Sequence, residues 1–330
     1  MIELNYQLAK KFIDRNLSSL NLASQEYDIN KLASDASFRS YYRIKFKNNL
    51  VSLMLMYAPV THERIDHFIH VDKFLVEHNL SAPQIRAIDE ENGFLLLEDF
   101  GDNTFTRVLK DNPKLELDLY KKACDVLVEL HNIDDKISLE SYNNHVMIRE
   151  VMLFIDWYLQ LTNKKISLSQ IANYKKLWFE LFDKISITKK VVVLRDYHAD
   201  NLMLLNNKDN YKSIGLLDFQ DALIGSPVYD LISLLDDIRR DIAKENRLEL
   251  YNYFIAKTNY QAENFFQDCE IISLQRNVKI LGIFARLVLR DKKDKYLDYI
   301  PRVKYFVECR LNSSNPIFND IKILLNNFIN

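Results

Sequence analysis

The chain has 330 residues, of which 48% are hydrophobic and 27% are charged, and this length permits two sizeable lobes. Its formal net charge of -2 gives no electrostatic footprint for a polyanion, which argues against a nucleic-acid partner. The three cysteines are scattered without CxxC spacing, and no run of about 18 apolar residues occurs, so we expect a cytoplasmic protein with no disulfide framework, zinc site or membrane span.

The N-terminal part of the chain is expected to be rich in strand. Residues 41–47 and 50–56 are strand-like and are joined by two asparagines, which predicts a β-hairpin. Residues 61–79 have apolar side chains at helical spacing. Residues 94–101 (FLLLEDFG) begin with an apolar run, which predicts a buried strand that runs into a turn.

Helices are expected farther along the chain. Residues 119–131 have apolar positions at helical spacing, and residues 150–158 (EVMLFIDWY) form another amphipathic piece. Two interpretations of the second piece remain open. It is either a helix with an aromatic core stripe, or a helix on which Glu150, Asp156 or Trp157 lines a pocket.

The centre of the chain predicts a strand, a loop and a hairpin. Residues 191–194 are an apolar, β-branched run typical of a buried strand, and the polar stretch 195–200 ends it. Residues 202–205 and 214–217 are two more apolar runs, and the turn-forming Asn and Asp residues between them predict a β-hairpin. A hairpin brings its two ends together. The residues just outside it, Asn201 and Asp218, should therefore meet.

These positions carry the residue types that phosphoryl transfer needs. The amide oxygen of Asn201 and the carboxylate of Asp218 are hard ligands suited to magnesium, and Asp196 could orient the hydroxyl group of an acceptor. Transfer of a γ-phosphoryl group asks for little else from a protein. An Asp in a loop is commonplace as a turn or cap residue, but the two motifs in order around a hairpin favour the catalytic interpretation.

The same motifs resemble those of the protein-kinase-like fold. Leu194-Arg195-Asp196 with Asn201 is similar to HRDxxxxN, and Asp218-Phe219-Gln220 is similar to DFG. The longer pattern DFQDA followed by GSPVYDL resembles the aminoglycoside phosphotransferase and choline kinase branch of that fold. In this branch Asp230 would be structural and would brace the catalytic loop.

The resemblance implies an α+β, two-lobe fold. Residues 1–98 would form a small, β-rich, nucleotide-binding lobe, and residues 99–330 a larger, mainly helical lobe that holds the catalytic and acceptor-binding groups. ATP and Mg²⁺ would be the cofactors. Further segments, SDASFRSYYR, LMYAP, EVMLFIDWY and RNVKILGIFARLVLRD, resemble the bacterial cell-wall amino-sugar kinases of this superfamily. These phosphorylate the anomeric hydroxyl of N-acetylmuramate and N-acetylglucosamine, and the implied role is cell-wall sugar recycling.

The resemblance also assigns residues to the nucleotide. Ser34 and Ser37 would lie in the turn that covers the phosphates, and this turn has no glycine. The alternative interpretation is a polar surface turn. Backbone groups around Glu98 and Phe100 would meet the adenine.

A lysine on the third strand pairs with the phosphates in protein kinases. The corresponding strand here offers Met54 and Met56 instead. Arg39 and Arg43 are the nearest cations that could substitute, although Arg43 could equally be an exposed strand residue.

The acceptor would be a small sugar, and the helices within residues 271–311 would form much of its pocket. Arginine and aspartate side chains could hydrogen-bond its hydroxyl groups and, in N-acetylmuramate, its carboxylate. Buried ion pairs between helices are the alternative interpretation. The acceptor-binding candidates are Glu150, Trp157, Arg286, Arg290 and Asp291.

Three rival functions remain open. An aminoglycoside or choline-type kinase would have a pocket rich in carboxylates. A protein kinase is disfavoured by the short stretch between Asp218 and Asp230, which leaves no room for a peptide-binding segment. A catalytically inactive nucleotide-binding protein is favoured by the missing strand lysine and opposed by the intact Asp196, Asn201 and Asp218. We expect a monomer or weak dimer.

Overall fold

The computed structural model describes residues 4–22, 25–32, 39–48, 51–63 and 65–329. The chain divides into two compact units that are discontinuous in sequence. The first contains Met1–Pro113 and Asp200–Asp221, and the second contains Lys114–Ala199 and Ala222–Asn330. The lobe boundary expected after residue 98 falls inside the first unit.

The first unit is built on a five-stranded antiparallel sheet with the strand order β1-β2-β3-β5-β4. The predicted hairpin is confirmed, with Ser40 of β2 opposite Tyr57 of β3. The predicted strand at residues 94–98 is β5, in the interior of the sheet. The five strands are β1 (Tyr27–Lys31), β2 (Ser40–Phe46), β3 (Ser52–Tyr57), β4 (Ile85–Asp89) and β5 (Phe94–Glu98).

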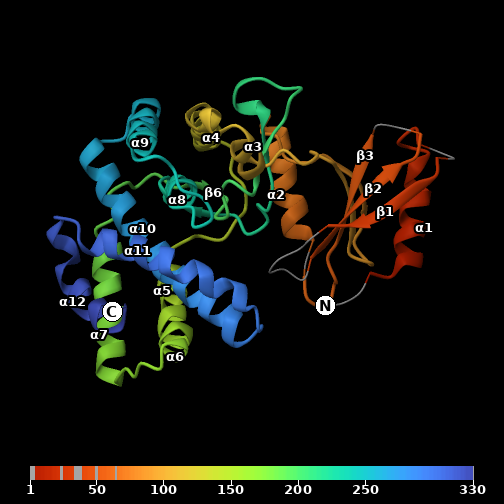
Figure 1. The fold of residues 1–330 in the computed structure, drawn as a ribbon. Helices are drawn as coiled ribbons and strands as arrows, with labels where there is room; N and C mark the ends of the chain where they lie inside the picture. Colours follow the sequence, from red (N-terminus) through yellow and green to blue (C-terminus); the bar gives the residue numbers. More distant parts are fainter. Residues whose placement is uncertain (1–3, 23–24, 33–38, 49–50, 64, 330) are drawn as a thin grey trace. The chain divides into compact units, whose positions relative to one another are not determined.

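Helix α1 (Tyr6–Leu17) lies against this sheet (Figure 1). The side chain of Asn5 caps it by accepting a hydrogen bond from the backbone N–H of Leu8 at 3.2 Å. Its buried face packs on alternate residues of the strands, and the rings of Phe12 and Phe94 stack with their centroids 5.7 Å apart. One face of the sheet is thereby sealed as an apolar core.

The strand residues on the other face follow from the period of two. The register puts Arg43 of β2 opposite Met54 of β3, and Met54 opposite Leu97 of β5.

The helix expected within residues 61–79 is α2 (Asp66–Glu77), which is shorter than the segment that the apolar spacing suggests. It buries Phe68, and the ring of Phe68 lies 5.0 Å from that of Phe219.

The predicted central hairpin is also confirmed within the first unit. Strands β7 (Leu202–Leu204) and β8 (Ile214–Leu216) pair antiparallel, with the 3-10 turn η3 (Asn210–Ser213) before β8. Backbone hydrogen bonds from Leu216 to Ser81 (2.7 Å) and from Leu204 to Asn103 (2.8 Å) attach the hairpin to the N-terminal part of the chain. The short helix α3 (Phe105–Asp111) follows Asn103.

The second unit is mainly helical. Its only strands among the described residues are β6 (Val191–Val193), which matches the predicted apolar run, and β9 (Leu223–Gly225), and these two pair antiparallel. The predicted helix at residues 119–131 is α4, which begins three residues earlier. The helical elements are α4 (Glu116–His131), α5 (Asn144–Leu153), η2 (Phe154–Tyr158), α6 (Leu159–Leu161), α7 (Leu168–Phe182), α8 (Tyr229–Leu235), α9 (Lys244–Thr258), α10 (Ala262–Leu289), η4 (Asp294–Tyr299), α11 (Ile300–Leu311), η5 (Pro316–Phe318) and α12 (Asn319–Ile329), and a 3-10 turn, η1 (Pro113–Leu115), precedes α4.

The long helix α10 packs closely on α5 at a glycine. A Cβ atom on Gly282 would lie 2.3 Å from the carbonyl carbon of Leu153, so no side chain fits between the two backbones. Directly after Leu153 the chain forms a π-helical turn, η2, which supplies the aromatic residues expected there. This turn buries Phe154 and Tyr158, so the aromatic stripe does contribute to the core.

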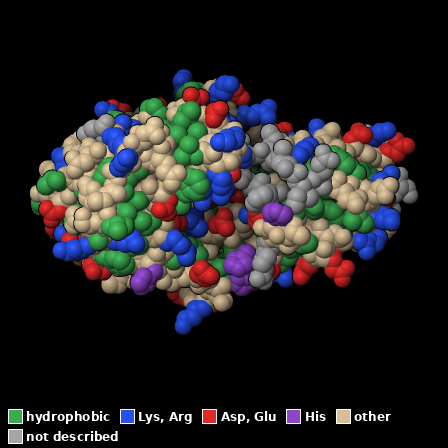
Figure 2. Space-filling model, turned by 90° about the horizontal axis from the view of Figure 1, so that it is seen from below, with side chains coloured by type: hydrophobic (Ala, Val, Ile, Leu, Met, Phe, Trp, Pro, Cys, Tyr) green, Lys and Arg blue, Asp and Glu red, His purple; other side chains and the backbone are tan. Residues whose placement is uncertain are grey.

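Together the sheet of the first unit and the helices of the second confirm the expected α+β fold class. No helix within the described residues is long and apolar enough to span a membrane. On the face of the molecule seen in Figure 2, basic and acidic side chains are interspersed.

An isolated acid is buried in helix α2. Asp72 is 2% exposed, and its Oδ2 atom has no hydrogen-bond partner among the described residues. Burial, with a smaller contribution from the carboxylate of Glu98, raises the pKa of Asp72 to about 7. Because the unfolded value is about 3.9, its stabilising contribution is complete below that pH and is lost as the pH rises through 7.

Replacing Asp72 with asparagine should therefore remove part of the pH dependence of stability. Between pH 5.5 and 8.5 the wild type should lose on the order of 1 to 2 kcal/mol more unfolding free energy than Asp72→Asn. Urea denaturation of both proteins at the two pH values measures the difference. Parallel losses in the two proteins would show that Asp72 does not titrate in this range.

Candidate active site

The hairpin β7-β8 carries two of the predicted site residues at its ends. The backbone N–H of Leu217 donates to the carbonyl of Asn201 at 3.0 Å, and Asn201 Nδ2 lies 3.5 Å from Asp218 Oδ2. Gln220 Nε2 donates to the other carboxylate oxygen at 2.9 Å. The expected meeting of Asn201 and Asp218 is thus observed, and the Asp218 side chain is exposed.

The donor chemistry of this pair fits magnesium. Mg²⁺ is usually held by one or two protein oxygen ligands together with substrate phosphates and water. Asn201 and Asp218 offer an amide oxygen and a carboxylate from opposite ends of one hairpin. Among the described residues no group of three or more His, Cys, Asp and Glu side chains could hold a metal by itself.

Asp196 belongs to the second unit, in the loop that follows β6. Its backbone N–H donates to the carbonyl of Leu194 at 2.9 Å, and its side chain is partly exposed. Arg195, the residue before it, has a positive φ of 72°. This left-handed residue changes the direction of the backbone between the buried strand β6 and the candidate base Asp196.

Asp230 sits in the first turn of α8 and is fully buried. Its two carboxylate oxygens accept the backbone N–H groups of Leu194 at 2.6 Å and Arg195 at 2.8 Å. Burial raises the pKa of Asp230 to about 7, and these two hydrogen bonds oppose the rise. The contacts are those of a residue that braces the loop before Asp196.

The candidate nucleotide residues belong to the first unit. Ser34 and Ser37 lie outside the described residues. Arg39 is 9% exposed and forms an ion pair with Glu63 at 3.3 Å. Burial and, to a smaller extent, the Asp218 carboxylate raise the pKa of Tyr41 to about 12, and Arg39 opposes the rise. Arg39 and Asp218 therefore act electrostatically on the same hydroxyl group.

Arg43 is engaged differently. Its guanidinium donates to Asp102 at 2.6 Å, to Asp99 at 3.0 Å and to the carbonyl of Gly101 at 2.8 Å. These three acceptors all lie in the turn after β5. Sequence reasoning offered Arg43 as a phosphate cation or an exposed strand residue, whereas the structure shows it 8% exposed and bound to the turn after β5.

Glu98 and Phe100 lie on either side of the end of β5. The Glu98 carboxylate accepts the backbone N–H of Gln84 at 3.2 Å. The ring of Phe100 covers Gly215 of β8, where an added Cβ atom would come within 2.8 Å of the ring. The ring thus closes on the strand that precedes Asp218.

The acceptor candidates do not form one cluster of contacts. Glu150 is 8% exposed and its carboxylate is occupied by other side chains. Arg290 and Asp291 bind each other through two hydrogen bonds of 2.7 and 2.9 Å at the end of α10. Trp157 is half-buried in η2, and Arg286 is half-buried with its Nε atom buried and without a hydrogen-bond partner among the described residues.

Sequence reasoning missed the residues that surround Glu150 and Arg195. Gln275 and Lys279 of α10 contact the Glu150 carboxylate at 3.0 and 3.5 Å. With Gly282 they are spaced by four and three residues, so they share one face of the helix. That spacing is visible in the sequence, and Arg286 continues the same face by a further four residues.

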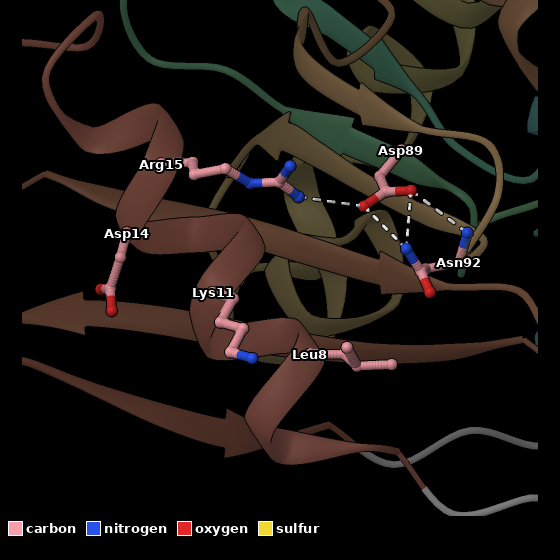
Figure 3. A pocket seen from close by; sticks show the side chains of 6 residues that line it. All are labelled: Leu8, Lys11, Asp14, Arg15, Asp89 and Asn92. Atoms are coloured by element: carbon pink, nitrogen blue, oxygen red, sulfur yellow. Dashed lines mark hydrogen bonds and ion pairs between the residues drawn. The ribbon is translucent and has the colours of Figure 1, made fainter.

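A separate pocket of about 570 Å³ lies beside α1 in the first unit (Figure 3). The Asp89 carboxylate accepts from Arg15 at 3.3 Å and from Asn92 at 3.0 Å on its wall. None of the predicted site residues lines this pocket, whose lining consists of Leu8, Lys11, Asp14, Arg15, Asp89 and Asn92.

The chain is similar to curated proteins along most of its length. It is 34% identical to an N-acetylmuramate/N-acetylglucosamine kinase of Pseudomonas aeruginosa, over 84% of this chain and 81% of that protein. It is 33% identical to a protein of the same name from Neisseria meningitidis, over 84% of each chain.

Solved structures share its fold at low sequence identity. A choline/ethanolamine kinase family protein from Mesorhizobium loti superposes with a TM-score of 0.63 at 11% identity, covering 96% of this chain and 99% of that one. A streptomycin-ATP complex of an aminoglycoside phosphotransferase gives a TM-score of 0.60 at 15% identity, covering 93% and 100%. These likenesses confirm the expected protein-kinase-like fold.

Residues 28–265 match the model of the phosphotransferase enzyme family, a span that includes the strand, loop and hairpin that carry Asp196, Asn201 and Asp218. This span is more than half of the chain. The protein belongs to the phosphotransferase enzyme family.

Proposed function

We propose that the protein transfers the γ-phosphoryl group of ATP to the anomeric hydroxyl of N-acetylmuramate or N-acetylglucosamine. The observation that carries the reaction type is the Asn201–Asp218 pair at the ends of the hairpin, with Asn201 five residues after Asp196. The sugar acceptor is supported by relatives of that name that are 33–34% identical over 84% of the chain.

In the proposed mechanism Asp196 accepts a hydrogen bond from the anomeric hydroxyl and orients its oxygen toward the γ-phosphorus. Asn201 and Asp218 would hold magnesium, which when bound would neutralise charge on the phosphates. Gln220, hydrogen-bonded to Asp218 at 2.9 Å, keeps one carboxylate oxygen oriented. The Asp230 carboxylate accepts the backbone N–H of Arg195 and so fixes the loop from which Asp196 projects.

Arg39 is the cation that we propose for the nucleotide phosphates in place of a strand lysine. Its guanidinium acts on the same tyrosine hydroxyl as the Asp218 carboxylate, and Glu63 orients it. The donors of Arg43 are directed at three acceptors of a turn, so Arg43 is better described as an anchor of that turn. In protein kinases the strand lysine also pairs with a glutamate on a helix. The Arg39–Glu63 pair would take the place of that pair.

The remaining assignments follow the family resemblance. We propose that Ser34 and Ser37 cover the phosphates and that the backbone near Glu98 and Phe100 meets the adenine, within a nucleotide lobe of residues 1–98 and a catalytic lobe of residues 99–330. The protein would be cytoplasmic and a monomer or weak dimer. The proposed sugar contacts are Trp157, Arg286, Arg290 and Asp291.

The first experiment is an ADP-release assay with ATP, Mg²⁺ and a panel of N-acetylmuramate, N-acetylglucosamine, choline and an aminoglycoside. Release is expected with the two amino sugars only, and ³¹P NMR should show a sugar 1-phosphate.

Asp196→Asn should lower kcat on the order of a hundredfold or more, because it removes the acceptor of the hydroxyl proton. Asp209→Asn, which changes an exposed carboxylate in the hairpin turn, is the matched control and should keep kcat within about twofold. Undiminished turnover in Asp196→Asn would refute the base assignment, and release with choline alone would refute the acceptor.

The second experiment separates the two arginines. Arg39→Ala should raise the KM for ATP on the order of tenfold or more, because one charge-assisted contact to phosphate is lost. Arg43→Ala should lower the melting temperature, because it leaves the buried Asp99 side chain without its guanidinium partner, and should change the KM less. A larger rise of the KM for ATP in Arg43→Ala than in Arg39→Ala would contradict this assignment and make Arg43 the phosphate-binding cation.

A further inference from the structure

The residue directly before the candidate base is held in a costly backbone conformation. Arg195 is not a glycine, yet its φ is 72°. A non-glycine residue in the left-handed region costs on the order of 1 to 3 kcal/mol and persists only when its surroundings enforce it. The contacts of Arg195 therefore show what holds this conformation, and with it the orientation of Asp196, the next residue.

Both backbone groups of Arg195 are fixed by helix α8. The N–H donates to Asp230 Oδ1 at 2.8 Å, and the carbonyl accepts from Ser233 Oγ at 3.0 Å. Ser233 is itself held by Arg276 of α10, whose Nη2 donates to it at 2.8 Å. These contacts fix the peptide planes on each side of Arg195.

The Arg195 side chain is held from another direction. Its Nη2 donates to Glu150 Oε1, and its guanidinium lies 5.8 Å from the centre of the Tyr142 ring. Glu150 comes from α5, some 45 residues earlier in the sequence. The guanidinium is thereby anchored to helix α5, which is distant in sequence from the loop that carries Asp196.

Glu150 is itself fully occupied. Its Oε2 accepts from the hydroxyl of Tyr142 and from Gln275 Nε2 at 3.0 Å, and lies 3.5 Å from Lys279 Nζ. Burial tends to raise the pKa of Glu150, but the charges of Lys279 and Arg195 and the neutral donors hold it below its usual value. The carboxylate is therefore ionised and its oxygens have fixed directions.

The geometry of this cluster depends on how closely α10 approaches α5. Gly282 lets the two helix backbones meet at Leu153, and Lys279 lies one turn earlier on the same face of α10. Lys279 also donates to the hydroxyl of Tyr229 at 2.6 Å, at the start of α8. The three helices α5, α8 and α10 thus share one network of buried charges.

We propose that Glu150 is a positioning residue for the phosphotransfer reaction, which acts through Arg195 to hold the strained backbone that presents Asp196. This inference rests on the proposed function of Asp196. It gives Glu150 a different role from contact with the sugar, and it makes Lys279 and Gln275 the residues that orient Glu150.

The test compares two buried glutamates. Glu150→Gln removes the charge that holds Arg195 but keeps the size of the side chain. Glu116→Gln is the matched control, because Glu116 is 7% exposed and likewise binds one arginine, Arg240 at 2.8 Å, and one amide, Asn246 at 2.8 Å. Both variants should lower the melting temperature. Only Glu150→Gln should lower kcat, on the order of tenfold, while the KM for ATP stays within about twofold.

A double-mutant cycle asks whether Glu150 acts through Arg195. Glycine adopts the left-handed conformation without strain, so Arg195→Gly removes the guanidinium while leaving this conformation accessible. If Glu150 works only through Arg195, Glu150→Gln should change kcat by less than about twofold in the Arg195→Gly background. Additive effects on kcat, or a Glu150→Gln variant with the wild-type kcat, would overturn the proposal.

A second readout does not depend on the acceptor. Amide hydrogen exchange of the segment Leu194–Tyr197 should be faster in Glu150→Gln than in the wild type and unchanged in Glu116→Gln. If the wild type releases no ADP with any acceptor, the proposed function fails, and the exchange rates still decide whether Glu150 holds the loop. Equal exchange in Glu150→Gln and the wild type would overturn the positioning role.

Discussion

The loop that carries Asp196 depends on the carboxylate of Asp230. This side chain is fully buried at the start of α8 and accepts the backbone N–H groups of Leu194 and Arg195. Without it, two buried donors at the end of β6 would lose their partner, each at a cost of about 1 to 3 kcal/mol. Asp230 therefore connects helix α8 to the end of β6 and to the start of the loop, and Asp196 is the residue that follows this connection.

The two halves of the proposed chemistry are held by different physical means. Asn201 and Asp218 are placed by a short hairpin, and the Asp218 side chain is exposed. Asp196 lies in a loop that is held by the buried Glu150 carboxylate against Arg195 and Lys279, and by the Asp230 carboxylate on the backbone N–H of Arg195. Such a buried network is a poor source of stability, since desolvation offsets most of the attraction, but it specifies direction well. Direction is what an oriented hydroxyl acceptor requires.

This difference explains what could be predicted from the sequence. The meeting of Asn201 and Asp218 follows from alternating patterns and turn residues within 20 positions, so local rules suffice. Arg195 and Gln275, two partners of Glu150, lie 45 and 125 residues away from it, and no periodicity connects them. The same holds for Arg43, whose acceptors at Asp99 and Asp102 are reached only because β2 and β5 flank β3. The first unit joins residues 200–221 to the N-terminal part of the chain. This division results from tertiary packing, so local sequence patterns did not predict it.

Helix α10 connects the loop to the region proposed for the sugar. Gln275 and Lys279 orient Glu150, Gly282 sets the distance to α5, and Arg286 continues the same face one turn farther. Seven residues separate Lys279 from Arg286, which is about 10 Å along a helix. A shift of α10 that moved Arg286 toward or away from an acceptor would also move Lys279 and thereby the Glu150–Arg195 pair. Under the proposed function, acceptor choice and the orientation of Asp196 are then coupled through one rigid element, and changes of substrate that preserve turnover should alter side chains near Arg286 and leave the packing at Gly282 intact.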